Sequence, residues 1–269
     1  MAKVGFIGGG NMAEALIKGI LSAGVYSKED IIVSDISEDR RKYLSTQYEL
    51  EVTDDNTKPA GSSDILIFSV KPQNIDDVLA DIKTSLKKGG VIVSIAAGVR
   101  TDKIKAALGN IAIIRVMPNT PALVGEGASG IFANEKGKKF IAQIKKILDA
   151  VGKCVIIEDE ELMDAVTAIS GSGPAYFFLL IEELIEAGIK EGLDEEVAKQ
   201  LALQTAKGAA ILAVEADEKG ESAADLRKKV TSPGGTTEAA LAEFKKAGFS
   251  NIVSSAVNRA VKRGKELSG

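Results

Sequence analysis

The chain has 269 residues, with 34 Lys and Arg against 38 Asp and Glu and a formal net charge of −4. It contains no histidine and a single cysteine, Cys154, which excludes histidine-dependent catalysis, histidine or thiolate metal clusters and an internal disulfide. The acidic balance, with an aromatic content of 4% and no tryptophan, argues against nucleic-acid binding.

The first half alternates apolar runs with helical patterns. The runs are short and rich in Val and Ile, which is typical of parallel strands covered on both faces. We expect strands at Val4–Ile7, Ile31–Ser34, Asp64–Val70, Val91–Ile95, Ile111–Val116 and Cys154–Ile157. We expect helices at Met12–Ser22, Asp39–Gln47, Ile75–Leu86, Asp102–Leu108 and Lys136–Val151. This alternation predicts an α/β domain of the Rossmann type, with a doubly wound parallel sheet, over residues 1–159.

The second half changes in character after about Glu158. Extended Val and Ile runs vanish and alanine becomes frequent. Helical patterns cover Glu161–Ile169, Pro174–Lys190, Glu195–Ala216, Ala223–Val230, Glu238–Ala247 and Asn251–Leu267. Residues 160–269 are therefore predicted to form an all-α domain.

The expected helix at Glu195–Ala216 is apolar on most of its faces, with alanines near i, i+4 spacing. Such a helix needs cover all round, either inside a monomeric bundle or in a subunit interface. Because this half of the chain supplies few elements for that cover, we favour an interface and a homo-oligomer.

The apolar runs of the sequence indicate the cellular compartment of the protein. The N-terminal apolar run is soon interrupted by glycine, which argues against a secretory signal. No apolar stretch approaches the roughly 18 residues of a membrane span. We therefore expect a cytoplasmic, soluble protein without a membrane partner.

The segment that follows the first expected strand fits the pattern G-x-G-x-x-G/A with Gly8, Gly10 and Ala13. The first glycine permits a tight turn, the second lets the backbone approach a pyrophosphate, and the alanine permits close helix packing. Asp35, at the end of the second strand, suits a ribose hydroxyl. These features predict a dinucleotide site, with a plain glycine turn as the alternative.

The choice between NADH and NADPH is open from the sequence. Asp35 would bind the ribose of NAD and repel a 2′-phosphate, whereas Ser34, Ser37, Arg40 and Arg41 lie close enough in sequence to donate to that phosphate.

Two Gly-Pro clusters precede expected helices, at residues 170–176 and 231–237. The second combines hydroxyls with unhindered backbone N–H groups at a helix start, which suits a small carboxylate. A turn followed by an ordinary threonine cap is the alternative.

Five segments together resemble the pyrroline-5-carboxylate reductase family: the glycine-rich start, Val70-Lys71-Pro72, and residues 117–121, 171–176 and 230–237. The resemblance runs essentially the whole length. It implies reduction of 1-pyrroline-5-carboxylate to L-proline, the last step of proline biosynthesis, with NADPH or NADH as cofactor. It also implies a dimer of interlocking helical domains.

The resemblance also implies site residues. Those expected to bind the cofactor are Phe6, Ile7, Gly8, Gly9, Gly10, Asn11, Met12, Ser34, Asp35, Asn56, Val70, Lys71, Pro72, Ala97 and Gly98. Those expected near the substrate are Glu160, Ser232, Gly234, Gly235, Thr236 and Thr237, with Thr237 on the substrate nitrogen as the catalytic contact. The chain departs from the family at Ser222-Ala223, where His-Pro is common, and at Lys229, where a neutral polar residue is common.

Two other functions share features with this sequence. The β-hydroxyacid dehydrogenases place a catalytic lysine and an asparagine where this chain has Phe177 and Ile181, which cannot act as a base. A dinucleotide sensor without chemistry would bind NADPH but would not oxidise it in the presence of substrate.

Overall fold

The computed structural model describes residues 4–268, which divide into two compact units. The first unit runs to Pro174 and takes in the chain again from Arg259, and the second spans Ala175–Asn258. The first unit extends beyond the boundary expected at residue 159, because the residues that follow pack against the sheet. A side chain at Gly130, for example, would meet Val166 at 2.6 Å.

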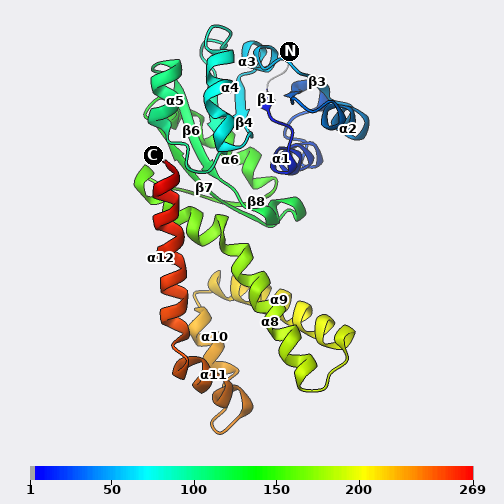
Figure 1. Ribbon diagram of the computed structural model, residues 1–269, viewed down its shortest axis with the longest axis vertical. Coiled ribbons are helices and arrows are strands. Elements are labelled where there is room, and N and C mark those ends of the chain that lie inside the picture. Colours follow the sequence, from blue (N-terminus) through cyan, green and yellow to red (C-terminus); the bar gives the residue numbers. More distant parts are fainter. Residues whose placement is uncertain (1–3, 269) are drawn as a thin grey trace. The chain divides into compact units, whose positions relative to one another are not determined.

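An eight-stranded sheet forms the centre of the first unit, in the order β3-β2-β1-β4-β5-β6-β7-β8 (Figure 1). Neighbouring strands are parallel except β6 and β7, which are antiparallel. The strands are β1 Val4–Ile7, β2 Ile31–Ser34, β3 Glu51–Thr53, β4 Ile65–Phe68, β5 Val91–Ser94, β6 Ala112–Met117, β7 Gly127–Ala133 and β8 Gly152–Ile156. The predicted doubly wound fold is confirmed.

Strands β3 and β7 were missed by the sequence analysis. β3 is a short edge strand that begins with the exposed Glu51, and β7 reads Gly-Ala-Ser-Gly before its only large apolar residues. Neither has the Val and Ile run by which a buried strand is recognised. The prediction of a parallel sheet therefore did not include the antiparallel pairing of β7 with β6.

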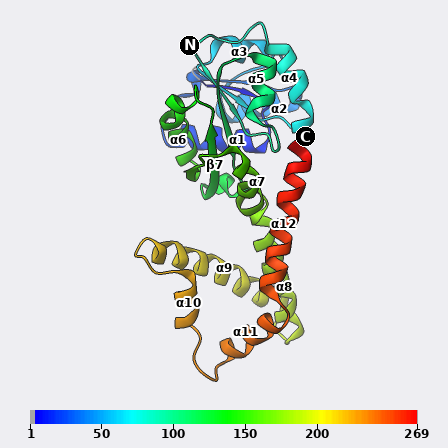
Figure 2. The same ribbon diagram turned by 90° about the vertical axis from the view of Figure 1, so that its left-hand side faces the viewer.

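Helices cover both faces of the sheet, as Figure 2 shows for α6 on one side and α4 and α5 on the other. One face carries α1 Asn11–Ser22, α2 Glu38–Tyr48 and α6 Ile141–Asp149, and the other carries α3 Thr57–Ser62, α4 Ile75–Ile82 and α5 Thr101–Leu108. Residues of β1 alternate between the two cores: Val4 and Phe6 pack in one, Ile7 in the other. Burial on both faces explains why the runs are apolar throughout.

Helices make up the rest of the described chain. After the 3-10 turn at Glu160–Leu162 come α7 Met163–Val166, a π-helical segment Thr167–Gly171, α8 Gly173–Lys190, α9 Glu195–Asp217, α10 Ala223–Lys229, α11 Thr236–Lys246 and α12 Phe249–Ser268. The expected helix at Glu161–Ile169 is thus divided into three segments, whereas the others agree closely with their expected ranges.

The alanine stripe of α9 is partly covered within the chain. Ala198 and Ala202 are buried, and Gly188 of α8 lies against Ala198. The rest of the stripe is open, since Ala209 is exposed and Ala206 and Ala213 are half-buried. Larger apolar residues of α9 are also exposed, including Leu201 and Leu212 at 55% and 53%. Apolar surface therefore remains both on the stripe and on the leucine-bearing side of the helix.

One described helical stretch, residues 160–190, is long and apolar enough to cross a membrane by length and composition alone. The expectation that no stretch reaches this limit is wrong, because Asp164 and Glu182 have no charged residue between them. Glycine, serine and alanine interrupt the apolar residues there, so no continuous apolar run marks this helix in the sequence.

Candidate active site

The turn between β1 and α1 has the geometry expected of a phosphate-binding loop. Gly8 has φ +94°, and a side chain there would meet the Ser69 carbonyl oxygen at 2.8 Å. Gly10 is the N-cap of α1, makes no side-chain cap and faces open space. The first amides of α1 are therefore available to an anion. Phe6 and Ile7 are buried in β1, so they would reach a cofactor only through their main chain.

Asp35 binds this turn directly. Its Oδ2 accepts a hydrogen bond from the Gly9 N–H at 2.7 Å, and its Oδ1 accepts one from the Ser37 N–H at 2.8 Å. The carboxylate thus fixes the backbone of the turn and sets a negative charge beside it. That charge is the feature expected to repel a 2′-phosphate.

The candidate phosphate donors near Asp35 are largely engaged with the protein. Ser34 is fully buried, and its hydroxyl donates to the Asn56 Oδ1 at 2.8 Å. Arg40 donates through Nε to the Gly9 carbonyl. Arg41 donates through Nη1 to the Asp35 carbonyl at 2.7 Å. Ser34 would therefore act on a cofactor through Asn56 rather than by its own contact.

Glu14 of α1 holds Arg40 in place. Its carboxylate pairs with the Arg40 guanidinium at 2.5 Å and accepts hydrogen bonds from the Tyr48 and Tyr43 hydroxyls at 2.8 and 2.9 Å. Although partial burial opposes ionisation, the hydrogen bonds from Arg40, Tyr48 and Tyr43 leave the pKa of Glu14 below its usual value. Burial and the hydrogen bond to Glu14 raise the pKa of Tyr48 to about 12. The sequence analysis missed this cluster, since its members are spread over two helices.

Loops after β4 and β5 contain the remaining residues that are expected to bind the cofactor. Lys71 and Pro72 are exposed and Val70 is half-buried after β4. After β5, Gly98 has φ +73°, and a side chain there would meet the backbone oxygen of Leu267 at 3.2 Å. The end of α12 thus touches the loop of Ala97 and Gly98, which no sequence motif indicated. The carboxyl ends of β1, β2, β4 and β5 bring all these segments to one edge of the sheet.

Glu160, which is expected near the substrate, is bound by residues of the first unit. It is 8% exposed, and its carboxylate accepts hydrogen bonds from the Thr101 N–H at 2.8 Å and the Thr101 hydroxyl at 2.6 Å. The Arg115 guanidinium lies 3.4 Å from Glu160 and 3.6 Å from Asp164. Glu160 therefore caps α5 and balances a buried arginine. Arg115 was missed, although a lone arginine in an apolar strand signals a buried partner.

The second Gly-Pro cluster lies in the second unit, where it leads into α11. Gly234 has φ +71°, and Gly235 is the N-cap without a side-chain cap. Thr237 is therefore the second residue of the helix and not its cap. Its hydroxyl makes no hydrogen bond within the described part of the chain. The alternative of an ordinary threonine cap is wrong.

One acid faces this cluster. The Glu238 carboxylate accepts a hydrogen bond from the Gly234 N–H at 2.8 Å. A substrate carboxylate at the Gly234 amide would have to displace Glu238, whereas the next amides of the helix start face no side-chain cap. The Gly235 N–H donates to the Ser232 carbonyl at 3.0 Å, so the Ser232 hydroxyl and the Thr236 amide are the groups that stay available for the expected role.

The remaining motifs have structural roles within their own units. The Asn119 side chain donates to the Ser170 carbonyl at 3.0 Å and accepts from the Ala128 N–H at 2.8 Å, which ties the loop after β6 to the π-helical segment. Ser222, where the family commonly has histidine, caps α10 by accepting from the Asp225 N–H at 3.2 Å. The Lys229 ammonium forms an ion pair with the Glu221 carboxylate at 2.5 Å, so the positive charge of Lys229 is balanced within the second unit.

Comparison with known proteins gives the family. A curated pyrroline-5-carboxylate reductase from Pseudomonas aeruginosa is 42% identical over 98% of this chain and 96% of its own length. The chain belongs to the pyrroline-5-carboxylate reductase family. A solved reductase of this name from Coxiella burnetii superposes with a TM-score of 0.93 at 38% identity, covering 100% of this chain and 99% of that one.

Further matches agree with this family. A Plasmodium falciparum pyrroline carboxylate reductase structure, described with NADP bound, has a TM-score of 0.86 at 35% identity, covering 100% of this chain and 98% of that one. Residues 160–267 match the family described as "Pyrroline-5-carboxylate reductase dimerisation", and residues 3–98 match "NADP oxidoreductase coenzyme F420-dependent". Residues 3–98 contain all the residues of this chain that are expected to bind the cofactor. No group of His, Cys, Asp and Glu that suits a metal ion occurs among the described residues.

Proposed function

We propose that this chain reduces 1-pyrroline-5-carboxylate to L-proline with NADPH or NADH, as the last step of proline biosynthesis. The observation that carries the proposal is the full-length relationship to reductases of that name. The turn at Gly8 and Gly10 fits the dinucleotide, since it combines a left-handed glycine with an uncapped helix start.

The cofactor site comprises the segments gathered at the carboxyl edge of the sheet. The amides at Gly10, Asn11 and Met12 hold the pyrophosphate, and Gly9, whose amide is bound by Asp35, shapes the turn. Asp35 faces the adenine ribose, and Asn56, held by the Ser34 hydroxyl, contacts the cofactor on that side. Val70, Lys71 and Pro72, with Ala97 and Gly98, continue the site toward the nicotinamide end.

The substrate site uses the start of α11. The Ser232 hydroxyl and the Thr236 amide hold the substrate carboxylate, and the Gly234 and Gly235 amides join them once Glu238 and the Ser232 carbonyl release them. The Thr237 hydroxyl accepts a hydrogen bond from the N–H of the protonated ring nitrogen. The uncapped helix start and the Thr237 hydroxyl, which makes no hydrogen bond within the described chain, support this assignment. Glu160 contributes by holding the start of α5 in place.

Catalysis here needs orientation more than acid–base chemistry. When bound, the reduced nicotinamide supplies the hydride. A protonated cyclic imine is already an electrophile, so the chain needs no histidine. The carboxylate clamp and the single hydroxyl of Thr237 fix the imine carbon in place, which supplies the proximity that such a reaction requires.

The helical residues match a dimerisation family, and we propose that the functional unit is a cytoplasmic homodimer formed by residues 160–267. The exposed apolar side chains of α8, including Phe177 and Phe178 at 67% and 62% exposure, support this assignment. Burial of such side chains against a second copy would remove the apolar surface from water.

Thr237→Val tests the substrate site, since it keeps the shape and removes the hydroxyl. We expect kcat/KM to fall roughly 10- to 1,000-fold, which corresponds to about 1.5–4 kcal/mol, with NADPH affinity little changed. Thr237→Ser should retain most activity. Thr236→Val is the matched control, because Thr236 contributes only its main chain. Wild-type turnover of Thr237→Val would remove Thr237 from the mechanism.

A further inference from the structure

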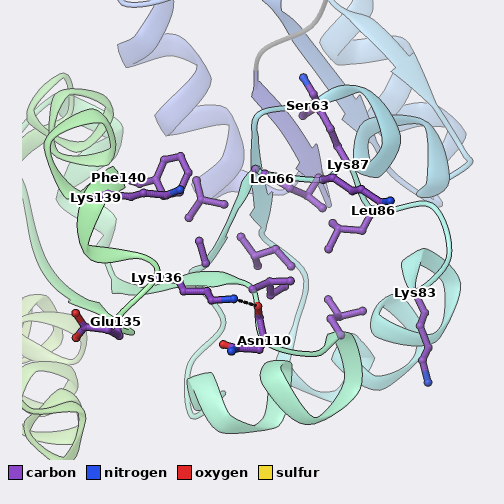
Figure 3. A pocket seen from close by; sticks show the side chains of 18 residues that line it. Ser63, Leu66, Lys83, Leu86, Lys87, Asn110, Glu135, Lys136, Lys139 and Phe140 are labelled. Carbon is purple, nitrogen blue, oxygen red and sulfur yellow. Dashed lines mark hydrogen bonds between the residues drawn. The ribbon is translucent and has the colours of Figure 1, made fainter.

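A cavity of about 600 Å³ opens in the first unit at the edge of the sheet opposite the proposed cofactor site (Figure 3). The partly exposed Leu86, Leu108, Ile111 and Phe140 form its apolar floor. Behind them lie the buried Leu66, Ile92 and Ala112, each at or near the start of its strand. The proposed cofactor loops follow the other ends of these same strands, so this cavity is not part of that site.

The lining is strongly basic. One acidic residue lines the cavity, Glu135, and it pairs with Lys138 at 2.7 Å. Five lysines line it: Lys83, Lys87, Lys88, Lys136 and Lys139. Lys87 pairs with Asp64 at 2.5 Å, whereas the other four form no ion pair with any described residue. The cavity therefore carries excess positive charge over an apolar floor.

Two of these lysines are held over the floor from the same side. The Lys136 ammonium donates to the Asn110 carbonyl at 2.7 Å, and the Lys139 ammonium lies 4.9 Å from the centre of the Phe140 ring. Figure 3 shows both side chains pointing inward, whereas Lys83 and Glu135 point away. Each of the two ammonium groups has protons left for an anion, since a carbonyl or a ring uses only part of its donor capacity.

We propose that this cavity binds a small organic carboxylate with an apolar body. The carboxylate would lie between Lys136 and Lys139, and the apolar body would cover the partly exposed Leu86, Ile111 and Phe140. The volume lies within the range of small-molecule sites, which combine an apolar lining with a few polar groups that fix orientation. An uncharged ligand would leave the ammonium groups without a counter-charge.

The probe for this site is 1-naphthoate, titrated by calorimetry against the full-length protein. Saturating NADP⁺ and L-proline are present so that the proposed active site is filled. We expect one naphthoate per chain, with the uncharged 1-naphthamide binding at least about tenfold more weakly.

Charge reversal locates the site. Lys136→Glu with Lys139→Glu should weaken naphthoate binding about 30-fold, because each close charge contact near a surface is worth about fivefold. Lys18→Glu, an exposed lysine of α1 outside the cavity, should bind as the wild type does. If the glutamate pair fails to fold, the pair Lys136→Gln and Lys139→Gln should show the same loss in smaller degree.

Three results would overturn the proposal. They are the absence of binding at millimolar naphthoate, equal affinity for naphthoate and naphthamide, and unchanged affinity in both lysine pairs. Turnover of pyrroline-5-carboxylate is measured separately, so that failure here is distinguishable from failure of the proposed function.

Discussion

Glu160→Gln separates a structural role of this residue from a role at the substrate. The glutamine keeps the volume but removes the negative charge that faces Arg115 at 3.4 Å. It also turns an amide group toward Thr101, whose N–H and hydroxyl both donate to the native carboxylate. The variant therefore loses the ion pair with Arg115, while the glutamine oxygen can still accept from the Thr101 N–H.

The expected loss in the free energy of unfolding follows from this geometry. Removing one partner of a buried ion pair costs about 3–5 kcal/mol, because the other charge is left uncompensated. Arg115 retains Asp164 at 3.6 Å, so the expected loss is at the lower end of this range, about 3 kcal/mol. Most of this loss should arise in the first unit.

The assay is urea unfolding at one fixed protein concentration, since oligomerisation makes stability depend on concentration. Glu161→Gln is the matched control: Glu161 is 60% exposed in its pair with Arg100, so little change in stability is expected. The KM for pyrroline-5-carboxylate is measured for both variants without urea, where both are folded. An unchanged unfolding free energy for Glu160→Gln, with a raised KM, would refute the structural role.

The remaining predictions concern the cofactor, stability and assembly. Asp35→Ser should shift the ratio of efficiencies toward NADPH by roughly 5- to 30-fold, since one unfavourable charge contact is worth about 1–2 kcal/mol; an unchanged ratio would remove Asp35 from the ribose site. The pKa of Glu14 is lowered in the folded chain, so its contribution to stability is present above its usual pKa near 4.5 and lost as the pH falls through the folded value. Unfolding curves of Glu14→Gln and wild type should therefore differ most near pH 7 and converge in acid, and a constant difference would contradict the pairing with Arg40. Leu212→Glu on the exposed side of α9 should give monomer or aggregate in sedimentation, whereas Gln204→Glu should sediment as the wild type, and a dimeric Leu212→Glu would place the interface elsewhere.

The sequence predicted the elements that carry a strong local signal. The strands at Val4–Ile7 and Ile31–Ser34 have the predicted bounds, because burial on both faces requires continuous apolar residues. The turn at Gly8 was equally readable, since only glycine fits its backbone. β7 and the π-helical segment were not predicted, because their stability comes from neighbours distant in the sequence.

The sequence by itself determined the alternation of strands and helices and the glycine turn at Gly8. It also singled out Thr237 at the start of α11 as a candidate site residue. These depend on periodicity and on backbone conformation, which are local properties. Only the tertiary structure decided that Asp35 binds the Gly9 amide, that Glu160 lies buried against Arg115, and that five lysines gather around one cavity. Residues distant in the sequence become partners in a hydrogen bond or an ion pair only when their elements pack together. The spacing of residues along the chain does not show which elements will pack.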